Sequence, residues 1–270
     1  MESEKGMKDM KKRSFKAVLL LFVLTTLTIA LGGCSGDKKG DISSQITIGI
    51  PQDLEDSLDP HKMVTAGTRE VLFNIFEGLV KVTSDGDFVP AVASSYEETE
   101  GGKVYTFTLR DNVKFHDGST VTAEDVKFSL DKCADTSAGE PLVAAFSNID
   151  SVNILDDKTV QVVLKEADTE FLAYMTTAII PASNADPDTN PIGTGPYKFV
   201  SRSPQENFVM ERFDDYWGEK PELTKVTYKI IENADSILLS LQSGAVDVFA
   251  HLTTTQIAQL GDGFHVEEGT

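Results

Sequence analysis

The sequence predicts a mixed α/β fold, because segments with strand periodicity alternate with segments with helical periodicity along its 270 residues. Apolar side chains occupy every second position in 45–50 and again in 105–109, as expected for half-buried strands. In 122–133 apolar side chains recur at helical spacing after a threonine that can cap a helix. Hydrophobic residues make up 40% of the chain, which is enough for a packed core.

The N-terminal segment has the pattern of a secretion signal. Residues 8–16 include five basic side chains, and the fifteen residues 17–31 carry no charge. This apolar stretch is shorter than the roughly 20 residues that span a bilayer, and its length is typical of a signal peptide. An N-terminal anchor helix is the alternative interpretation.

The four residues Leu31-Gly32-Gly33-Cys34 close this segment and resemble a bacterial lipobox. The resemblance implies that residues 1–33 are a lipoprotein signal peptide and that Cys34 is lipidated after their removal. Residues 34–44 would then form a flexible tether. Two acyl chains anchor a protein durably, whereas a single chain binds a membrane only marginally. We therefore expect a lipid-anchored protein on the extracytoplasmic side of the cell membrane.

The first predicted strand is Gln45–Ile50, with its isoleucines on one face. A loop bounded by prolines, Pro51–Pro60, follows this strand. A helix is predicted from about Thr68, because apolar residues then recur at helical spacing, at Val71, Leu72, Ile75, Phe76 and Leu79.

The segment Tyr105–Leu130 predicts a strand, a turn and a helix in immediate succession. The pair Asp117-Gly118 forms the turn, whose glycine can adopt a positive φ without steric cost. Thr122 stands three residues before Asp125, an arrangement like a capping box. The helix that follows has one apolar face, made of Val126, Leu130 and Cys133.

The rest of the chain continues this alternation. The pattern predicts a hairpin at Ser151–Leu164, a strand at Lys225–Ile231, a helix capped by Asp235 and ending at Gly244, a strand at Val246–Phe249, and a last strand around Phe264 and Val266.

Charge and cysteine content restrict the function. The formal net charge of −19 argues against nucleic acid and anionic lipid headgroups as partners. With Cys34 lipidated, Cys133 has no cysteine partner, so no intramolecular disulfide forms. Its position on the apolar helix face predicts a buried structural thiol rather than a nucleophile.

The sequence lacks the spacings of metal sites and catalytic motifs. The four histidines, His61, His116, His251 and His265, do not have metal-ligand spacing. Nucleophile elbows and Cys-x-x-Cys pairs are also absent. The Gly-Thr-Gly at 193–195 lies between prolines and lacks the lysine and helix of a phosphate loop. We therefore expect no enzyme activity, no metal site and no cofactor.

Six segments carry a family resemblance in a consistent order and spacing: Asn74–Val80, Phe88–Tyr96, Tyr105–Leu130, Pro191–Phe199, Tyr216–Gly218 and Leu241–Asp247. They resemble signatures of the bacterial extracellular solute-binding proteins of family 5, the peptide- and nickel-type receptors of ABC importers. The resemblance extends from about residue 45 to the last residue.

This resemblance implies a periplasmic-binding-protein-like fold of the type II, peptide-binding class, with mixed sheets and two lobes joined by a hinge. Residues 45–80 and 190–270 would build an incomplete first lobe. Residues 81–189 would build an accessory domain packed on that lobe. The opposing lobe would be missing, because family members are much longer. We interpret the chain as an N-terminal half, truncated, and a naturally minimal one-lobe receptor is the alternative.

The resemblance also implies that the ligand is held where two lobes close on it. The predicted ligand contacts are Gln52, Asp53, Leu54 and Glu55 after the first strand, Thr65, Ala66 and Gly67 before the helix, and Gly193, Thr194, Gly195 and Tyr197. For the acidic residues a solvated surface charge is the alternative, and for the glycines a role in backbone geometry alone. The segment 105–130 maps to the accessory domain and away from this predicted cleft.

The predicted function is that of a monomeric substrate-binding component of an ABC importer. It would capture oligopeptides or dipeptides and deliver them to the membrane permease subunits. Two alternatives share these motifs: a receptor for nickel, a metal chelate or another solute, and a peptide-sensing lipoprotein without a transport role.

Overall fold

The computed structural model describes residues 44–55, 57–137 and 139–267. The predicted signal peptide, Cys34 and nearly all of the predicted tether lie outside these residues. Within the described ranges, no helix has the length and hydrophobicity needed to cross a bilayer.

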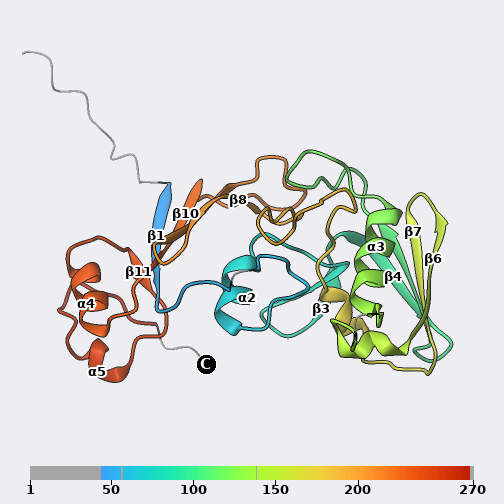
Figure 1. Ribbon diagram of the computed structural model, residues 1–270, viewed down its shortest axis with the longest axis horizontal. Helices are drawn as coiled ribbons and strands as arrows, with labels where there is room; N and C mark the ends of the chain where they lie inside the picture. Colours follow the sequence, from blue (N-terminus) through green and yellow to red (C-terminus); the bar gives the residue numbers. More distant parts are fainter. Residues whose placement is uncertain (1–43, 56, 138, 268–270) are drawn as a thin grey trace, which may run out of the picture. The chain divides into compact units, whose positions relative to one another are not determined.

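One sheet has five strands in the order β11–β1–β10–β9–β8 and combines distant parts of the chain (Figure 1). Strand β1 pairs in parallel with both β10 and β11, whereas β9 pairs in antiparallel with both β10 and β8. The chain therefore leaves this sheet after β1 and returns to it at β8. The strand bounds are β1 Gln45–Ile50, β8 Tyr197–Ser203, β9 Asn207–Arg212, β10 Lys225–Ile230 and β11 Val248–Phe249.

The intervening chain builds an antiparallel sheet in the order β4–β5–β7–β6. Helix α3 packs against β6 and β7, as Figure 1 shows. The predicted hairpin is confirmed as β6 and β7. The bounds are β4 Ala93–Thr99, β5 Val104–Leu109, β6 Ile149–Asp156, β7 Thr159–Leu164 and α3 Ala123–Ala134, with the pair β2 Val80–Val82 and β3 Phe88–Pro90 and the 3₁₀ helices η1 Ala144–Asn148 and η2 Phe171–Thr176.

The predicted succession of strand, turn and capped helix is confirmed. Gly118 has a φ of 88°, which suits the turn before α3. Thr122 and Asp125 form both hydrogen bonds of a capping box at the start of α3. Cys133 is buried on the inner face of the helix, and burial raises the pKa of its thiol to about 12. The prediction of a structural thiol is therefore confirmed.

The five-stranded and the four-stranded sheets each have their own hydrophobic core. The core on the four-stranded sheet contains fully buried aromatic rings, including Tyr105, Phe107 and Phe171. The core on the five-stranded sheet contains Leu72, Phe208 and other buried residues. A smaller cluster lies under α4 (Ala234–Gln242) and α5 (Thr254–Ile257).

Helix α2 (Ala66–Leu72) is shorter than the apolar spacing predicts. That spacing continues to Leu79, but the chain leaves the helix after its seventh residue. The Ile75 carbonyl oxygen accepts a hydrogen bond from the Gly195 N–H at 2.9 Å, where a helix would use the N–H four residues on. The buried apolar side chains Ile75, Phe76 and Leu79 therefore belong to the turn and loop after α2 and not to a helix.

Two further predictions need correction near the C-terminal end. Asn233, and not Asp235, caps α4, because the backbone stays extended up to Asn233 and its side chain accepts the first helical N–H groups. Gly244 ends the helix with a φ of 70°, as predicted, but the strand after it is only the two residues of β11. No strand forms at 264–266, where the ring of Phe264 packs on the smaller cluster from a loop.

Candidate ligand-binding site

An arginine of β8 holds the predicted ligand loop that follows β1. The Arg202 guanidinium donates to the backbone carbonyls of Leu54 and Glu55, both at 2.8 Å. It also lies 3.4 Å from the carboxylate of Asp53, which accepts a backbone N–H from the β8–β9 turn at 2.8 Å. Burial opposes ionisation of Asp53, but its hydrogen bonds and the arginine charge outweigh burial and lower the pKa of this carboxyl. Asp53 therefore has structural partners, and Gln52 before it is exposed.

The carboxylate of Glu55 connects this loop to the start of α2. Its oxygens accept the N–H groups of Thr65 at 2.9 Å and Val64 at 3.2 Å. The Thr65 side chain caps α2 by accepting the N–H of Thr68 at 3.4 Å. The structure thus brings two of the three predicted segments together, and it leaves residues 65–67 exposed.

The third predicted segment is buried within the protein. Gly193, Thr194, Gly195 and Tyr197 are all buried. A Cβ atom on Gly193 would lie 2.2 Å from the carbonyl oxygen of Ile75, so only glycine permits this approach of two backbones. Burial and close packing favour a role in backbone geometry, and ligand contact at these four residues stays a prediction.

His116 clamps this segment, although the sequence places it away from the predicted cleft. Its Nε2–H donates to the carbonyl oxygen of Gly195 at 3.0 Å, and its Nδ1 accepts the N–H of Gly193 at 3.3 Å. Both ring nitrogens are therefore used by the neutral imidazole. Burial, aided by the charge of Lys198, lowers the pKa of His116 to about 4.

The half-buried carboxylate of Glu77, in the segment 74–80, accepts hydrogen bonds from two other segments of the family resemblance, 191–199 and 216–218. Tyr216 and Trp217 each donate to it at 2.7 Å, from the hydroxyl and the indole N–H. Thr194 donates from its hydroxyl at 3.4 Å. Burial raises the pKa of Glu77 in spite of these donors. Arg110, after β5, lies over the Trp217 ring with its guanidinium carbon 4.4 Å from the ring centroid.

A pocket of about 320 Å³ lies beside the second half of α2 and the turn that follows it, and most of the residues that line it are apolar. Two of the large apolar side chains that line it are exposed: Phe73 at 67% and Leu142 at 47%. Exposed apolar side chains gathered around a hollow are typical of a binding site. The pocket is lined by Pro60, His61, Met63, Arg69, Leu72, Phe73, Phe76, Leu142, Val143, Thr176, Thr177 and Ala178.

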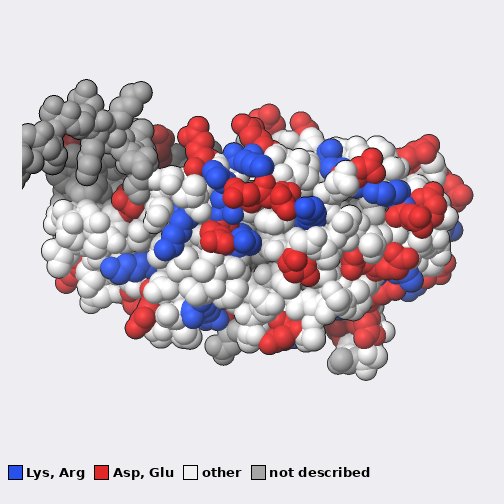
Figure 2. All heavy atoms as spheres, turned by 90° about the horizontal axis from the view of Figure 1, so that it is seen from above, with Lys and Arg blue, Asp and Glu red and all other residues white. Residues whose placement is uncertain are grey.

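Two larger hollows are less suited to binding. One of about 550 Å³ lies between α3 and β6, and one of about 460 Å³ lies beside β8 and β9. The second is lined by charges that already pair, Lys198 with Glu211 and Arg212 with Asp214, both at 2.9 Å. Figure 2 shows acidic and basic side chains interspersed over one face rather than gathered by sign. Within the described residues, no three His, Cys, Asp or Glu side chains are grouped to hold a metal ion.

The residues that line the pocket are not among the ligand contacts predicted from the sequence. Phe73 does not belong to the apolar face predicted for this helix, and its side chain is exposed. Leu142 and the segment 176–178 come from loops without periodicity. Proximity in sequence to the predicted segment 65–67 was the one signal available for Phe73.

A comparison with protein families identifies the chain. Residues 87–268 match the model described as "Bacterial extracellular solute-binding proteins, family 5 Middle". The chain belongs to this family. The expectation from the six sequence segments is therefore confirmed.

Two curated relatives illustrate this membership. The oligopeptide-binding protein AppA of Bacillus subtilis (strain 168) is 30% identical over 268 residues, which cover 88% of this chain and 48% of that protein. The nickel-binding periplasmic protein of Escherichia coli (strain K12) is 30% identical over 201 residues, which cover 71% of this chain and 38% of that protein. The chain thus spans half or less of the length of these relatives.

Solved structures confirm the fold class. The periplasmic binding protein DppA from Helicobacter pylori, in complex with the peptide STSA, has a TM-score of 0.73 and 27% identity over 80% of this chain and 48% of that one. AppA from Bacillus subtilis, in complex with a nonapeptide, has a TM-score of 0.68 and 27% identity over 75% of this chain and 43% of that one. The prediction of a periplasmic-binding fold of the peptide-binding class is confirmed.

Replacing Glu77 with Ala should lower the free energy of unfolding by about 3 kcal/mol, because the hydroxyl of Tyr216 and the indole N–H of the half-buried Trp217 lose their acceptor. Trp217 is the single tryptophan of the chain, so its fluorescence in a urea titration reports on this site directly. The exposed Glu219→Ala is the matched control and should change stability little. Equal stability of the two variants would contradict the structural role of Glu77.

Acid should destabilise the protein through His116. The folded-state pKa of about 4 lies below the usual value of 6.5, so the stability from the neutral ring is complete above pH 6.5 and is lost as the pH falls through 4. Between pH 7 and pH 4 the wild type should lose about 3 kcal/mol more unfolding free energy than His116→Gln. Urea titrations at both pH values measure this, with the exposed His265→Gln as control. A pH dependence that is unchanged in His116→Gln would refute the assignment.

Proposed function

We propose that the chain is the ligand-capturing part of a lipid-anchored receptor that binds short peptides outside the cytoplasmic membrane and delivers them to the permease of an ABC importer. The observation that carries this proposal is the pocket of about 320 Å³, whose lining includes the exposed side chains of Phe73 and Leu142. A pocket of this size accommodates an apolar side chain of a peptide, while backbone groups nearby hold an extended main chain. The peptide-bound relatives AppA and DppA support the same ligand class.

The position of the pocket fits a division of the chain into two domains. We assign residues 45–80 and 190–270 to a first lobe and residues 81–189 to an accessory domain. The separate cores of the two sheets support this division. Residues 60–76 of the pocket then come from the first lobe, and its other walls come from the accessory domain.

The lining of the pocket favours a peptide over a metal ion. Most of its side chains are apolar, and its one histidine, His61, already donates from Nε2 to the carbonyl oxygen of Ala178 at 2.8 Å. Burial, and then the charge of Lys132, lower the pKa of His61, so it is neutral at physiological pH. The proposed role is binding without catalysis, as a monomer that hands its ligand to the permease.

A titration with the tripeptide Ala-Phe-Ala, followed by amide chemical shifts, tests peptide binding. The amides of Met63, Phe73 and Leu142 should shift together and saturate, because these residues line the pocket. Chemical shifts detect binding even in the millimolar range, which suits a chain that spans half the length of its relatives.

The matched variants sharpen this test. Phe73→Ala should weaken the tripeptide about tenfold through lost apolar contact. Leu239→Ala removes a side chain of nearly equal exposure, 66%, outside the pocket and should leave the affinity unchanged. Shifts confined to residues outside the pocket, or equal effects of the two variants, would rule out this site.

Lipid anchoring is tested separately by metabolic labelling with palmitate in a bacterial host. We expect label on the wild type and on Cys133→Ala, but none on Cys34→Ala, because Cys34 stands at the lipobox-like motif. Label that persists on Cys34→Ala would disprove lipidation at this residue.

A further inference from the structure

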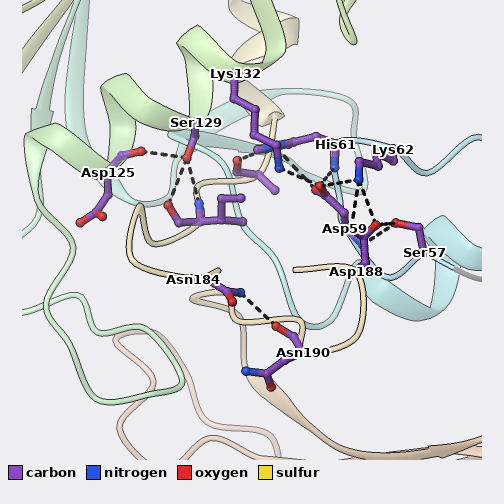
Figure 3. A network of polar contacts seen from close by, with 12 residues as sticks. Ser57, Asp59, His61, Lys62, Asp125, Ser129, Lys132, Asn184, Asp188 and Asn190 are labelled. Atoms are coloured by element: carbon purple, nitrogen blue, oxygen red, sulfur yellow. Dashed lines mark hydrogen bonds and ion pairs between the residues drawn. The ribbon is translucent and has the colours of Figure 1, made fainter. Parts of the chain in front are cut away.

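Helix α3 does not line the pocket, but three residues near its C-terminal end contact residues that line it or lie next to the lining. Figure 3 shows Lys132 and Ser129 extending from α3 toward the loops below it. The Lys132 ammonium donates to the carboxylate of Asp59 at 2.7 Å. The Ser129 hydroxyl accepts the N–H of Ile180 at 3.0 Å. The backbone carbonyl of Cys133 accepts a hydrogen bond from the next loop at 3.3 Å.

Each contact is made in or next to a different segment of the pocket lining, and we call the segments 60–63, 142–143 and 176–178 the three walls. Asp59 directly precedes the wall residues 60–63. Ile180 follows the wall segment 176–178. The carbonyl of Cys133 binds the N–H of Val143, which is itself a lining residue. One turn of α3 therefore fixes the three walls relative to one another.

The contact with Asp59 differs from the other two because it is ionic and buried. The Asp59 side chain is 1% exposed and that of Lys132 is 24% exposed. The other carboxylate oxygen of Asp59 accepts the N–H of His61 at 3.1 Å, which shapes the loop at the start of the wall. Lys132 is the nearer of two ammonium groups beside the carboxylate oxygen that it binds, since that of Lys62 lies 3.9 Å away. A buried carboxylate that loses its closest cation is unfavourable, so the loop stays where Lys132 can reach it.

A second, exposed set of contacts holds the same loop from its other side. Lys62 pairs with Asp188 at 3.0 Å, and Ser57 donates to the same carboxylate (Figure 3). Both side chains of the Lys62–Asp188 pair are more than 40% exposed, so solvent screens it. The buried pair of Asp59 with Lys132 is the stronger restraint.

We propose that Lys132 is a positioning residue for the pocket: its ion pair with Asp59 holds the wall 60–63 in register with the walls that α3 fixes by hydrogen bonds. The proposal rests on the proposed peptide-binding function for its effect on affinity. Its effect on the loop itself does not depend on any ligand. Lys132 touches no ligand in this role, and it acts through Asp59 on the lining residues.

Two measurements on the full chain test the role of Lys132. The first is amide hydrogen exchange without ligand, in Lys132→Met and in the matched control Lys127→Met. Lys127 lies on the same helix and pairs with Asp131 at 2.8 Å, away from the pocket. In Lys132→Met the amide of His61 should exchange at least about tenfold faster, while the amides of Val143 and Ile180 keep their rates.

The second measurement is Ala-Phe-Ala affinity at a temperature where every variant is folded. Lys132→Met should weaken binding about tenfold, Lys132→Arg should restore most of it, and Lys127→Met should leave it unchanged. If Lys132→Met does not fold, the double variant Asp59→Asn/Lys132→Met replaces it. That variant leaves no buried unpaired charge, and it should show the same fast exchange at His61.

The outcomes separate this proposal from the peptide-binding function. Fast exchange at His61 in a protein that binds no tripeptide would support positioning and refute the peptide function. Equal acceleration at all three amides would mean general destabilisation and would overturn positioning. Unchanged exchange at His61, or equal effects of Lys132→Met and Lys127→Met on affinity, would overturn it as well.

Discussion

The half-buried carboxylate of Glu77 is the contact on which the arrangement of the rest depends. It stands just after α2, where the chain passes from the core of one sheet to the core of the other. A carboxylate that is partly removed from water needs hydrogen-bond donors to offset the lost hydration. The donors come from Thr194 and from the Tyr216-Trp217 pair, segments more than one hundred residues away in sequence. Glu77 therefore determines where the returning chain packs, and Arg110 extends the same contact to the four-stranded sheet.

The end of α2 follows from this arrangement. Gly195 packs so closely on the backbone after α2 that its N–H takes the carbonyl of Ile75, and the helix cannot continue. Phe73 follows α2 with helical backbone dihedrals and lies on the face opposite the buried Val71, so its side chain is exposed beside the pocket. On the opposite side of the pocket, α3 orders the other walls by two hydrogen bonds and one buried ion pair.

The ends of a helix or turn are predicted correctly where they depend on residues close by in the sequence. The capping box at Thr122 and the turn at Gly118 depend on contacts within a few residues, and both are correct. The extent of α2 depends on Gly195, which no periodicity near α2 reveals, and it is predicted too long. The site shows the same division. Glu55 and Thr65 of two predicted segments are in contact, and ligand binding by segments 52–55 and 65–67 stays a prediction, whereas the pocket depends on loops that only the tertiary fold brings together.

Many side chains in the segments that identify the family make hydrogen bonds within the protein, and we call these contacts the structural frame. Trp217 donates to Glu77, and both ring nitrogens of His116 bind the backbone of 193–195. Side chains engaged in this way cannot also discriminate between ligands. Two relatives at 30% identity, one named for oligopeptides and the other for nickel, are consistent with a shared frame and different ligand contacts. Under the proposed peptide-binding function, ligand choice would depend on side chains without such structural contacts, and Phe73 and Leu142 are exposed at the pocket.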